Sequence, residues 1–161
     1  MKYRTPYRSW GNVNKGSEIY SMACTHDSKS LITGDEDGTI KVFSVENCSL
    51  LYDYGRIYTD GFIWPILLCP TKDNLFIAGG DGYSYSFLHQ WTIHGGRVLR
   101  ESYDVDYSEV VTMCVSRDGE FLYTLDKKGM VRKFCTERRK LVDWWRYFDG
   151  SGEGIQAFSL V

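Results

Sequence analysis

The sequence predicts an all-β fold made of repeated units of four short antiparallel strands. The first observation is a six-residue segment that recurs at steps of 45, 46 and 45 residues, beginning at Ile19, Trp64, Val110 and Ile155. In every copy the first and fourth residues are large and apolar. The second observation is that no window sustains the 3.6-residue apolar period of a helix. A period of about 45 residues with four short strands is typical of a β-propeller blade.

The first repeat shows the unit most clearly. A polar turn at 26–29 follows its first strand, and the pair Asp37-Gly38 suits a tight hairpin because glycine tolerates a positive φ angle. The third strand ends on Phe43, and the aromatic residues Trp91 and Phe134 end the corresponding strands later in the chain. Strands are therefore expected in this repeat at 19–24, 30–34 and 39–43, with an outer strand in CSLLYDYG at 48–55.

The later repeats are expected to follow the same order. In the second, a longer turn at 79–86 precedes the third strand, and an outer strand covers 97–103. In the third, the turn DKKG occupies 126–129 and the last strand lies within KLVDWWRYF, followed by one further inner strand at 155–160. The chain thus divides into an N-terminal outer strand and loop at 1–18, blades at 19–58, 59–107 and 108–151, and the first strand of a truncated fourth blade at 152–161.

Several stretches resemble the WD40-repeat family. The strings TGDEDGTIKVF at 33–43 and SRDGEFLYTL at 116–125 are the most similar, together with the strand-ending Trp91, and the resemblance covers roughly residues 19–161. The family's Trp-Asp pair is replaced by Phe43-Ser44, Trp91-Thr92 and Phe134-Cys135, and no Gly-His pair precedes a first strand. The resemblance implies a divergent WD40-like propeller. The Asp, His, Ser and Trp hydrogen-bond network of the best-formed blades is therefore not expected, and packing should supply more of the stability.

The sequence is too short for the number of blades that a closed propeller usually contains. Propellers usually close with four to eight blades, and seven blades of this size would need about 315 residues, whereas the sequence has 161. The prediction is therefore an incomplete arc of about three four-stranded antiparallel blades. Three explanations remain open. The chain is a fragment or short form of a longer propeller, it covers its open faces with a second copy or another propeller segment, or it is a small monomer with covered ends.

Composition excludes several classes of function. The net charge of −2 argues against a nucleic-acid footprint and against a basic membrane patch. No apolar run is long enough to span a membrane, and the first ten residues lack the apolar centre of a secretory signal. The five cysteines lie at apolar strand positions without metal-ligand spacing, which predicts reduced thiols in a cytoplasmic or nuclear protein. Basic and aromatic residues alternate in 3–10, where an edge strand is favoured over nucleic-acid binding.

The sequence predicts no catalytic, cofactor-binding or metal-binding site. His26, His89 and His94 fall in different parts of the repeat and lack zinc-ligand spacing. No nucleophile elbow or phosphate-binding loop is present. The acidic cluster at 35–37 is interpreted as a solvated turn, with weak cation binding as the alternative.

Surface candidates for partner binding come from two places. In a propeller, the turns between second and third strands and the loops leading to the next inner strand share one rim, and tyrosine there favours protein recognition. The other place is the pair Trp144-Trp145 beside Arg146, where consecutive residues should point to opposite faces, one into the core and the other exposed or covered by a neighbour. The rim candidates are Asp35, Glu36, Asp37, Tyr58, Asp60, Asp81, Tyr83, Tyr85, Asp106, Tyr107, Lys127 and Lys128.

Two classes of function compete on this reading. The favoured one is a non-catalytic WD40-like scaffold or subunit that binds other proteins, without nucleic acid, membrane or cofactor. The alternative is a propeller enzyme, such as a lactonase-like hydrolase or a quinoprotein, whose site would need ligands from the missing blades. An RNA-binding propeller is disfavoured by the acidic net charge.

Overall fold

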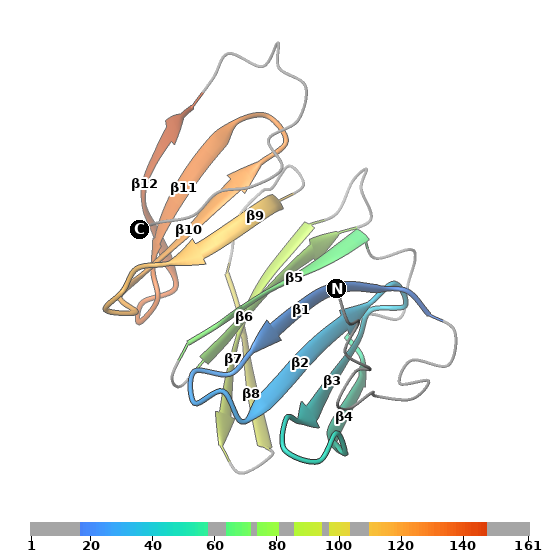
Figure 1. Ribbon diagram of the computed structural model, residues 1–161. Helices are drawn as coiled ribbons and strands as arrows, with labels where there is room; N and C mark the ends of the chain where they lie inside the picture. Colours follow the sequence, from blue (N-terminus) through green and yellow to red (C-terminus); the bar gives the residue numbers. More distant parts are fainter. Residues whose placement is uncertain are drawn as a thin grey trace, which may run out of the picture.

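The chain folds into three four-stranded antiparallel sheets (Figure 1). The computed structural model describes residues 17–57, 64–71, 74–80, 86–94, 97–103 and 110–147. Within these ranges no residue is helical, as the absence of a 3.6-residue apolar period predicted. The all-β fold of about three propeller blades is therefore confirmed.

The first sheet has the simple order β1-β2-β3-β4. The polar turn after β1 and the Asp37-Gly38 turn after β2 lie where the sequence placed them, and Gly38 adopts a φ of 79°. These turns fix the register, so that Met22 pairs with Thr33 and Thr33 with Lys41. The strands are β1 Ile19–Cys24, β2 Ser30–Asp35, β3 Thr39–Ser44 and β4 Leu50–Arg56.

The second and third sheets repeat this order. Hairpins again join neighbouring strands, and the aromatic residues Trp91 and Phe134 lie in the third strand of their sheets. The second sheet consists of β5 Trp64–Pro70, β6 Asn74–Gly80, β7 Ser86–His94 and β8 Arg97–Ser102. The third consists of β9 Val110–Val115, β10 Phe121–Asp126, β11 Met130–Cys135 and β12 Lys140–Arg146.

The second sheet lies between the other two (Figure 1), with β5 beside both β1 and β9. Alternation along β6 sends successive side chains to opposite faces, so Leu75 and Ile77 pack toward the first sheet while Phe76 and Ala78 pack toward the third. Two apolar clusters result, one at each junction between sheets. The first contains Ile32, Ile40, Val42, Ile57, Leu75, Ile77, Phe87 and Trp91. The second contains Phe76, Ala78, Leu88, Tyr103, Val110, Met113, Leu122 and Phe134.

Some predicted features lie outside the described residues. They include the N-terminal segment 1–16 with its alternating basic and aromatic residues, the middle of the turn at 79–86, and the inner strand expected at 155–160. The boundaries placed at 58/59, 107/108 and 151/152 also lie there, so the division into units remains a prediction.

The cysteines differ in part from the prediction that all occupy apolar strand positions. Cys48 lies in the turn between β3 and β4 with a φ of 60°, because a positive φ is needed to return the chain into β4. Cys24 is exposed on β1, whereas Cys135 is buried at the end of β11. No disulfide joins Cys24, Cys48, Cys114 and Cys135, the cysteines whose side chains the structure describes.

Candidate functional site

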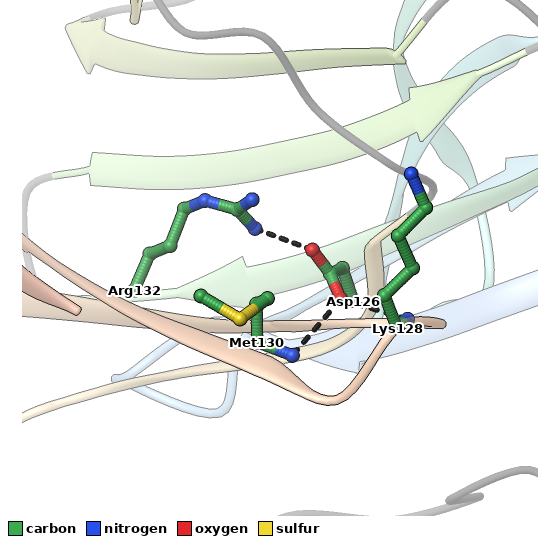
Figure 2. A network of polar contacts seen from close by, with 4 residues as sticks. All are labelled: Asp126, Lys128, Met130 and Arg132. Atoms are coloured by element: carbon green, nitrogen blue, oxygen red, sulfur yellow. Dashed lines mark hydrogen bonds and ion pairs between the residues drawn. The ribbon is translucent and has the colours of Figure 1, made fainter. Parts of the chain in front are cut away.

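The turn between β10 and β11 is held by a buried carboxylate. Asp126 is 1% exposed, and its Oδ1 accepts hydrogen bonds from the backbone N–H groups of Lys128 at 2.8 Å and Met130 at 3.0 Å. Its Oδ2 lies 2.6 Å from Nη1 of Arg132, in a charge-assisted pair (Figure 2). These bonds fix the backbone of the turn. Lys127 and Lys128 are exposed at its tip.

The turn between β2 and β3 has a similar construction. Asp35 is 2% exposed and its Oδ1 accepts the N–H of Thr39 at 2.8 Å. Burial raises the pKa of this carboxyl group, and the Thr39 N–H and the charge of Lys41 act against that rise. Lys41 occupies the repeat position of Arg132. The expectation that Asp35 is part of a solvated turn is wrong, because its side chain turns inward to satisfy the backbone behind the turn.

The tip of the turn between β2 and β3 is acidic. Glu36 donates its backbone N–H to the carbonyl oxygen of Glu18 at 2.8 Å, which brings two glutamates together. Burial and then the charges of Glu36 and Glu18 raise the pKa of Tyr20. Asp37 is exposed and lies 3.0 Å from Nη2 of Arg56. Arg56 offsets one of the three carboxylate charges of Glu18, Glu36 and Asp37, so the surroundings of the turn stay net acidic.

The two turns carry opposite charges on the same rim. Both join the second and third strands of their sheets, and the sheets run in the same order around the arc. Glu36 and Asp37 lie on the first sheet, whereas Lys127 and Lys128 lie on the third. The remaining predicted rim residues, Tyr58, Asp60, Asp81, Tyr83, Tyr85, Asp106 and Tyr107, lie outside the described residues.

The aromatic pair on β12 differs from the prediction that one ring is buried. Trp144 is 60% exposed and Trp145 is 40% exposed. The reason is that β12 is the outer strand of its sheet, and all seven of its side chains are exposed. The rings do lie on opposite faces, and Trp145 contacts Tyr123 edge to face at 6.4 Å between centroids. Arg146 is also exposed, so all three candidates are accessible.

The inward role of the turn carboxylates was missed by the sequence reasoning. The signal was present as a recurrence: Asp35 and Asp126 each precede a glycine by three residues and a basic residue by six. Both glycines have a positive φ, and each donates its N–H to the carbonyl of the aspartate. The first and third sheets therefore share a turn whose aspartate side chain accepts hydrogen bonds from the backbone of that turn. In the second sheet Gly80 takes the aspartate's position.

The histidines occupy unrelated places. His26 is exposed in a turn, whereas His89 is buried in β7. In the ranges that the structure covers, no three His, Cys, Asp or Glu side chains are grouped as metal ligands would be. Those ranges also contain no helix long and apolar enough to cross a membrane.

Comparisons with known proteins agree with this architecture. The model of the family described as WD domain, G-beta repeat matches residues 6–44, which end with β3. No curated protein sequence matches the chain.

Solved structures share the fold at low sequence identity. A structure of U3-55K is 16% identical with a TM-score of 0.68, and the alignment covers 81% of this chain and 40% of that one. The crystal structure of the RRP9 WD40 repeats is 15% identical with a TM-score of 0.68, covering 81% and 39%. A chain of the Mitotic Checkpoint Complex is 14% identical with a TM-score of 0.69, covering 86% and 40%. This protein thus spans about 40% of the length of these structures. The match at residues 6–44 shows similarity to one WD40 repeat, and the solved structures show that the chain shares the fold of WD40 propellers.

Proposed function

We propose that this protein is a non-catalytic interaction scaffold, or a subunit of a larger assembly, that binds other proteins through its charged rim. The WD40 fold fits such a role in general. No enzymatic activity is proposed, because the sequence contains no nucleophile elbow and no phosphate-binding loop. One of the similar structures is itself a complex, the Mitotic Checkpoint Complex.

The observation that carries the proposal is the rigid presentation of charge at the turns. The buried carboxylates of Asp35 and Asp126 hold the backbone from beneath. The side chains at the tips therefore lose little backbone freedom when a partner binds, which lowers the entropic cost of association. Glu36 and Asp37 favour a basic partner segment, and Lys127 and Lys128 an acidic one. A partner with both charges would be oriented along the rim.

The wider rim belongs to the same proposal. Asp60, Asp81, Tyr83 and Tyr85 are expected to extend the contact between the acidic and basic turns, where the tyrosines would supply contact area. Trp144, Trp145 and Arg146 are proposed as a second contact on the outer strand. The cytosol or nucleus is the proposed compartment, since cysteines that form no disulfide are typical there. Imaging of the tagged full chain would test this, and secretion would contradict it.

Site-specific photo-crosslinking in cells tests the rim directly. A photo-reactive amino acid is placed at Lys128, and the matched control carries it at Asn47, an exposed turn position at the opposite end of the sheets. We expect a discrete crosslinked protein from position 128 that is absent from position 47. Adding Lys127→Glu should weaken the crosslink, because one of the two proposed charges is reversed. The same products from both positions, or a crosslink insensitive to Lys127→Glu, would contradict rim binding.

A further inference from the structure

We propose that an extended acidic peptide of a partner protein binds along β12 as a fifth strand of the third sheet. Such a strand would be one contact of the scaffold proposed above, on which this inference rests. β12 is the outer strand of its sheet, hydrogen-bonded to β11 along one side and to no described strand along the other (Figure 1). An edge of this kind presents backbone N–H and C=O groups with which an added strand can pair.

The backbone of β12 directs alternate residues to its outer edge. In an antiparallel pair, alternate residues turn their N–H and C=O groups toward the partner strand. Tyr147 donates its N–H to the carbonyl oxygen of Gly129 at 2.8 Å, on the β11 side, so Trp144 and Arg146 direct theirs to the outer edge. The N–H of Trp144 donates to Oδ1 of its own neighbour Asp143 at 2.8 Å. This carboxylate takes the place that a carbonyl oxygen of an added strand would occupy.

The outer strand of the first sheet is less suited to the same role. The pairing of β4 with β3 shifts register at two places, and Gly55 within β4 has a φ of 64°. Irregularities of this kind twist an edge away from further pairing. The pairing of β12 with β11 shifts once, toward the start of β12, and residues 143–146 then pair without interruption. The third sheet therefore has a regular stretch of outer edge that the first sheet lacks.

The side chains of β12 and of the residue after it offer apolar contact on both sides of that edge. Trp144 is 60% exposed, Trp145 40% and Tyr147 70%. Consecutive residues of a strand point to opposite faces, so an added strand would lie against Trp144 on one face and Trp145 on the other. Leu141 and Val142 add further exposed apolar area. Exposed aromatic residues of this size are frequent anchors of protein contacts.

Charge selects an acidic segment as the occupant. The third sheet and its turns, residues 110–147, contain nine lysine and arginine residues and five aspartate and glutamate residues, whereas 17–57 of the first sheet contain three and seven. β12 begins at the exposed Lys140 and ends at the exposed Arg146, with Asp143 between them as its one acidic residue. A segment with carboxylates near both of its ends would be steered to this edge and oriented on it.

The edge of β12 is distinct from the surfaces that join neighbouring sheets. Both junctions inside the chain are formed by faces, through alternate side chains of β6 such as Ile77 and Phe76. A further blade packed in the same way would cover a face of the third sheet and leave this outer edge accessible. Strand addition at β12 therefore does not compete with the packing of another sheet.

Selection from a phage-displayed library of random peptides on the purified full chain tests the partner class. We expect enriched peptides to contain more aspartate and glutamate than the unselected library, and Arg146→Glu to weaken their binding by about tenfold or more. The matched control is Arg117→Glu, an equal change of charge at an exposed position of the same sheet, which should bind them as the wild type does. No enrichment, a preference for basic peptides, equal effects of both variants, or tighter binding of a single-stranded oligonucleotide at β12 would overturn the proposal.

Removing the carboxylate of Asp143 should have the opposite effect. Asp143→Ala releases the N–H of Trp144 and removes a charge that repels acidic peptides, so their affinity should rise about fivefold. Misfolding does not produce a gain of this kind. The matched control is Asp53→Ala, which removes an exposed aspartate of β4 that accepts the N–H of Gly55 at 2.8 Å and should leave the affinity unchanged. An unchanged or lower affinity in Asp143→Ala would contradict pairing at this edge.

Backbone methylation of a selected peptide separates strand addition from binding by side chains alone. N-methyl groups on one set of alternate peptide residues should abolish binding, and those on the other set should be tolerated, because only alternate N–H groups face β12. Amide exchange followed by NMR should slow at Trp144 and Arg146 in the complex. Slow exchange there in the unbound chain, protection of β4 or β8 in place of β12, or tolerance of both methylated sets would overturn strand addition. The rim crosslink from Lys128 reports on the scaffold role independently.

Discussion

At the scale of single residues, the buried aspartates beneath the turns are the most consequential side chains. Asp126 satisfies two backbone N–H groups and one guanidinium with a single carboxylate. Hydrogen bonds to an ionised group contribute more than neutral ones, and this carboxylate has no contact with solvent to replace them. Its role is therefore to make the turn rigid, which the proposed rim requires.

Removing this carboxylate should be costly. We expect Asp126→Ala to lower the free energy of unfolding by about 3 kcal/mol, because Arg132 loses its buried counter-charge and two N–H groups lose their acceptor. The comparison is Asp118→Ala, at an exposed aspartate that accepts hydrogen bonds from Ser116 and from the backbone of Glu120. Asp118→Ala should lower the free energy of unfolding by only about 1 kcal/mol. Urea denaturation measures both, and equal losses would show that burial of Asp126 adds nothing.

The sequence could predict these turns but not the direction of their carboxylates. Glycine three residues after Asp35 and Asp126 indicates a tight turn, because a positive φ is needed there. An acidic residue in a turn is usually exposed, so burial was not the expected result. The carboxylates are buried because the folded turn offers them backbone N–H donors and a basic residue on the following strand, Lys41 or Arg132. These partners come near only after the hairpin forms.

At the scale of elements, one turn design joins first and second strands in both outer sheets. In the first sheet Thr25 Oγ1 donates to Asp27 and accepts the N–H of Ser30. In the third, Ser116 Oγ donates to Asp118 and accepts the N–H of Phe121. The hydroxyl bond lowers the pKa of each aspartate. Each turn also contains a residue with positive φ, which is a serine in one sheet and a glycine in the other.

This difference gives a pair of opposite predictions. Gly119 has a φ of 79° and Ser28 a φ of 57°. We expect Gly119→Ser to reduce the free energy of unfolding by about 1 kcal/mol, since a side chain disfavours this backbone conformation. A Cβ atom at Gly119 would meet no atom within 4 Å, so a clash does not contribute. Ser28→Gly should leave stability unchanged or raise it, and chemical denaturation of both variants measures the difference. A loss of stability in Ser28→Gly would contradict strain as the cause.

At the scale of the whole molecule, the repeat predicted the sheets but not which of their faces are covered. Alternating apolar residues and turn signals are local properties, so the strands appear where the pattern placed them. Whether a side chain is buried depends instead on which other elements pack against it. Met22 and Met113 hold the same place in the sequence pattern, yet Met22 is exposed and Met113 is buried, because the third sheet packs against the second at Met113. The same reasoning explains Trp145, whose equivalent Tyr54 has a neighbour.

The second sheet packs against both of its neighbours, because alternate side chains of β6 belong to the two different junctions between sheets. Phe76 and Ile77 are adjacent and both fully buried, but Phe76 belongs to the cluster shared with the third sheet and Ile77 to the cluster shared with the first. Truncating a buried Phe or Ile to alanine costs about 2–5 kcal/mol through lost contacts and the cavity left behind. The two losses should therefore weaken different junctions.

Hydrogen exchange measured by mass spectrometry can distinguish these junctions in the folded chain. We expect Phe76→Ala to increase exchange mainly in β9–β12, whereas Ile77→Ala should increase it mainly in β1–β4, because each cavity loosens the sheet that shared the lost contact. Each variant serves as the matched control for the other, since the substitutions are adjacent on one strand. Identical exchange maps for the two variants would mean that the arc opens as one cooperative unit, and the description of separate junctions between sheets would then be wrong.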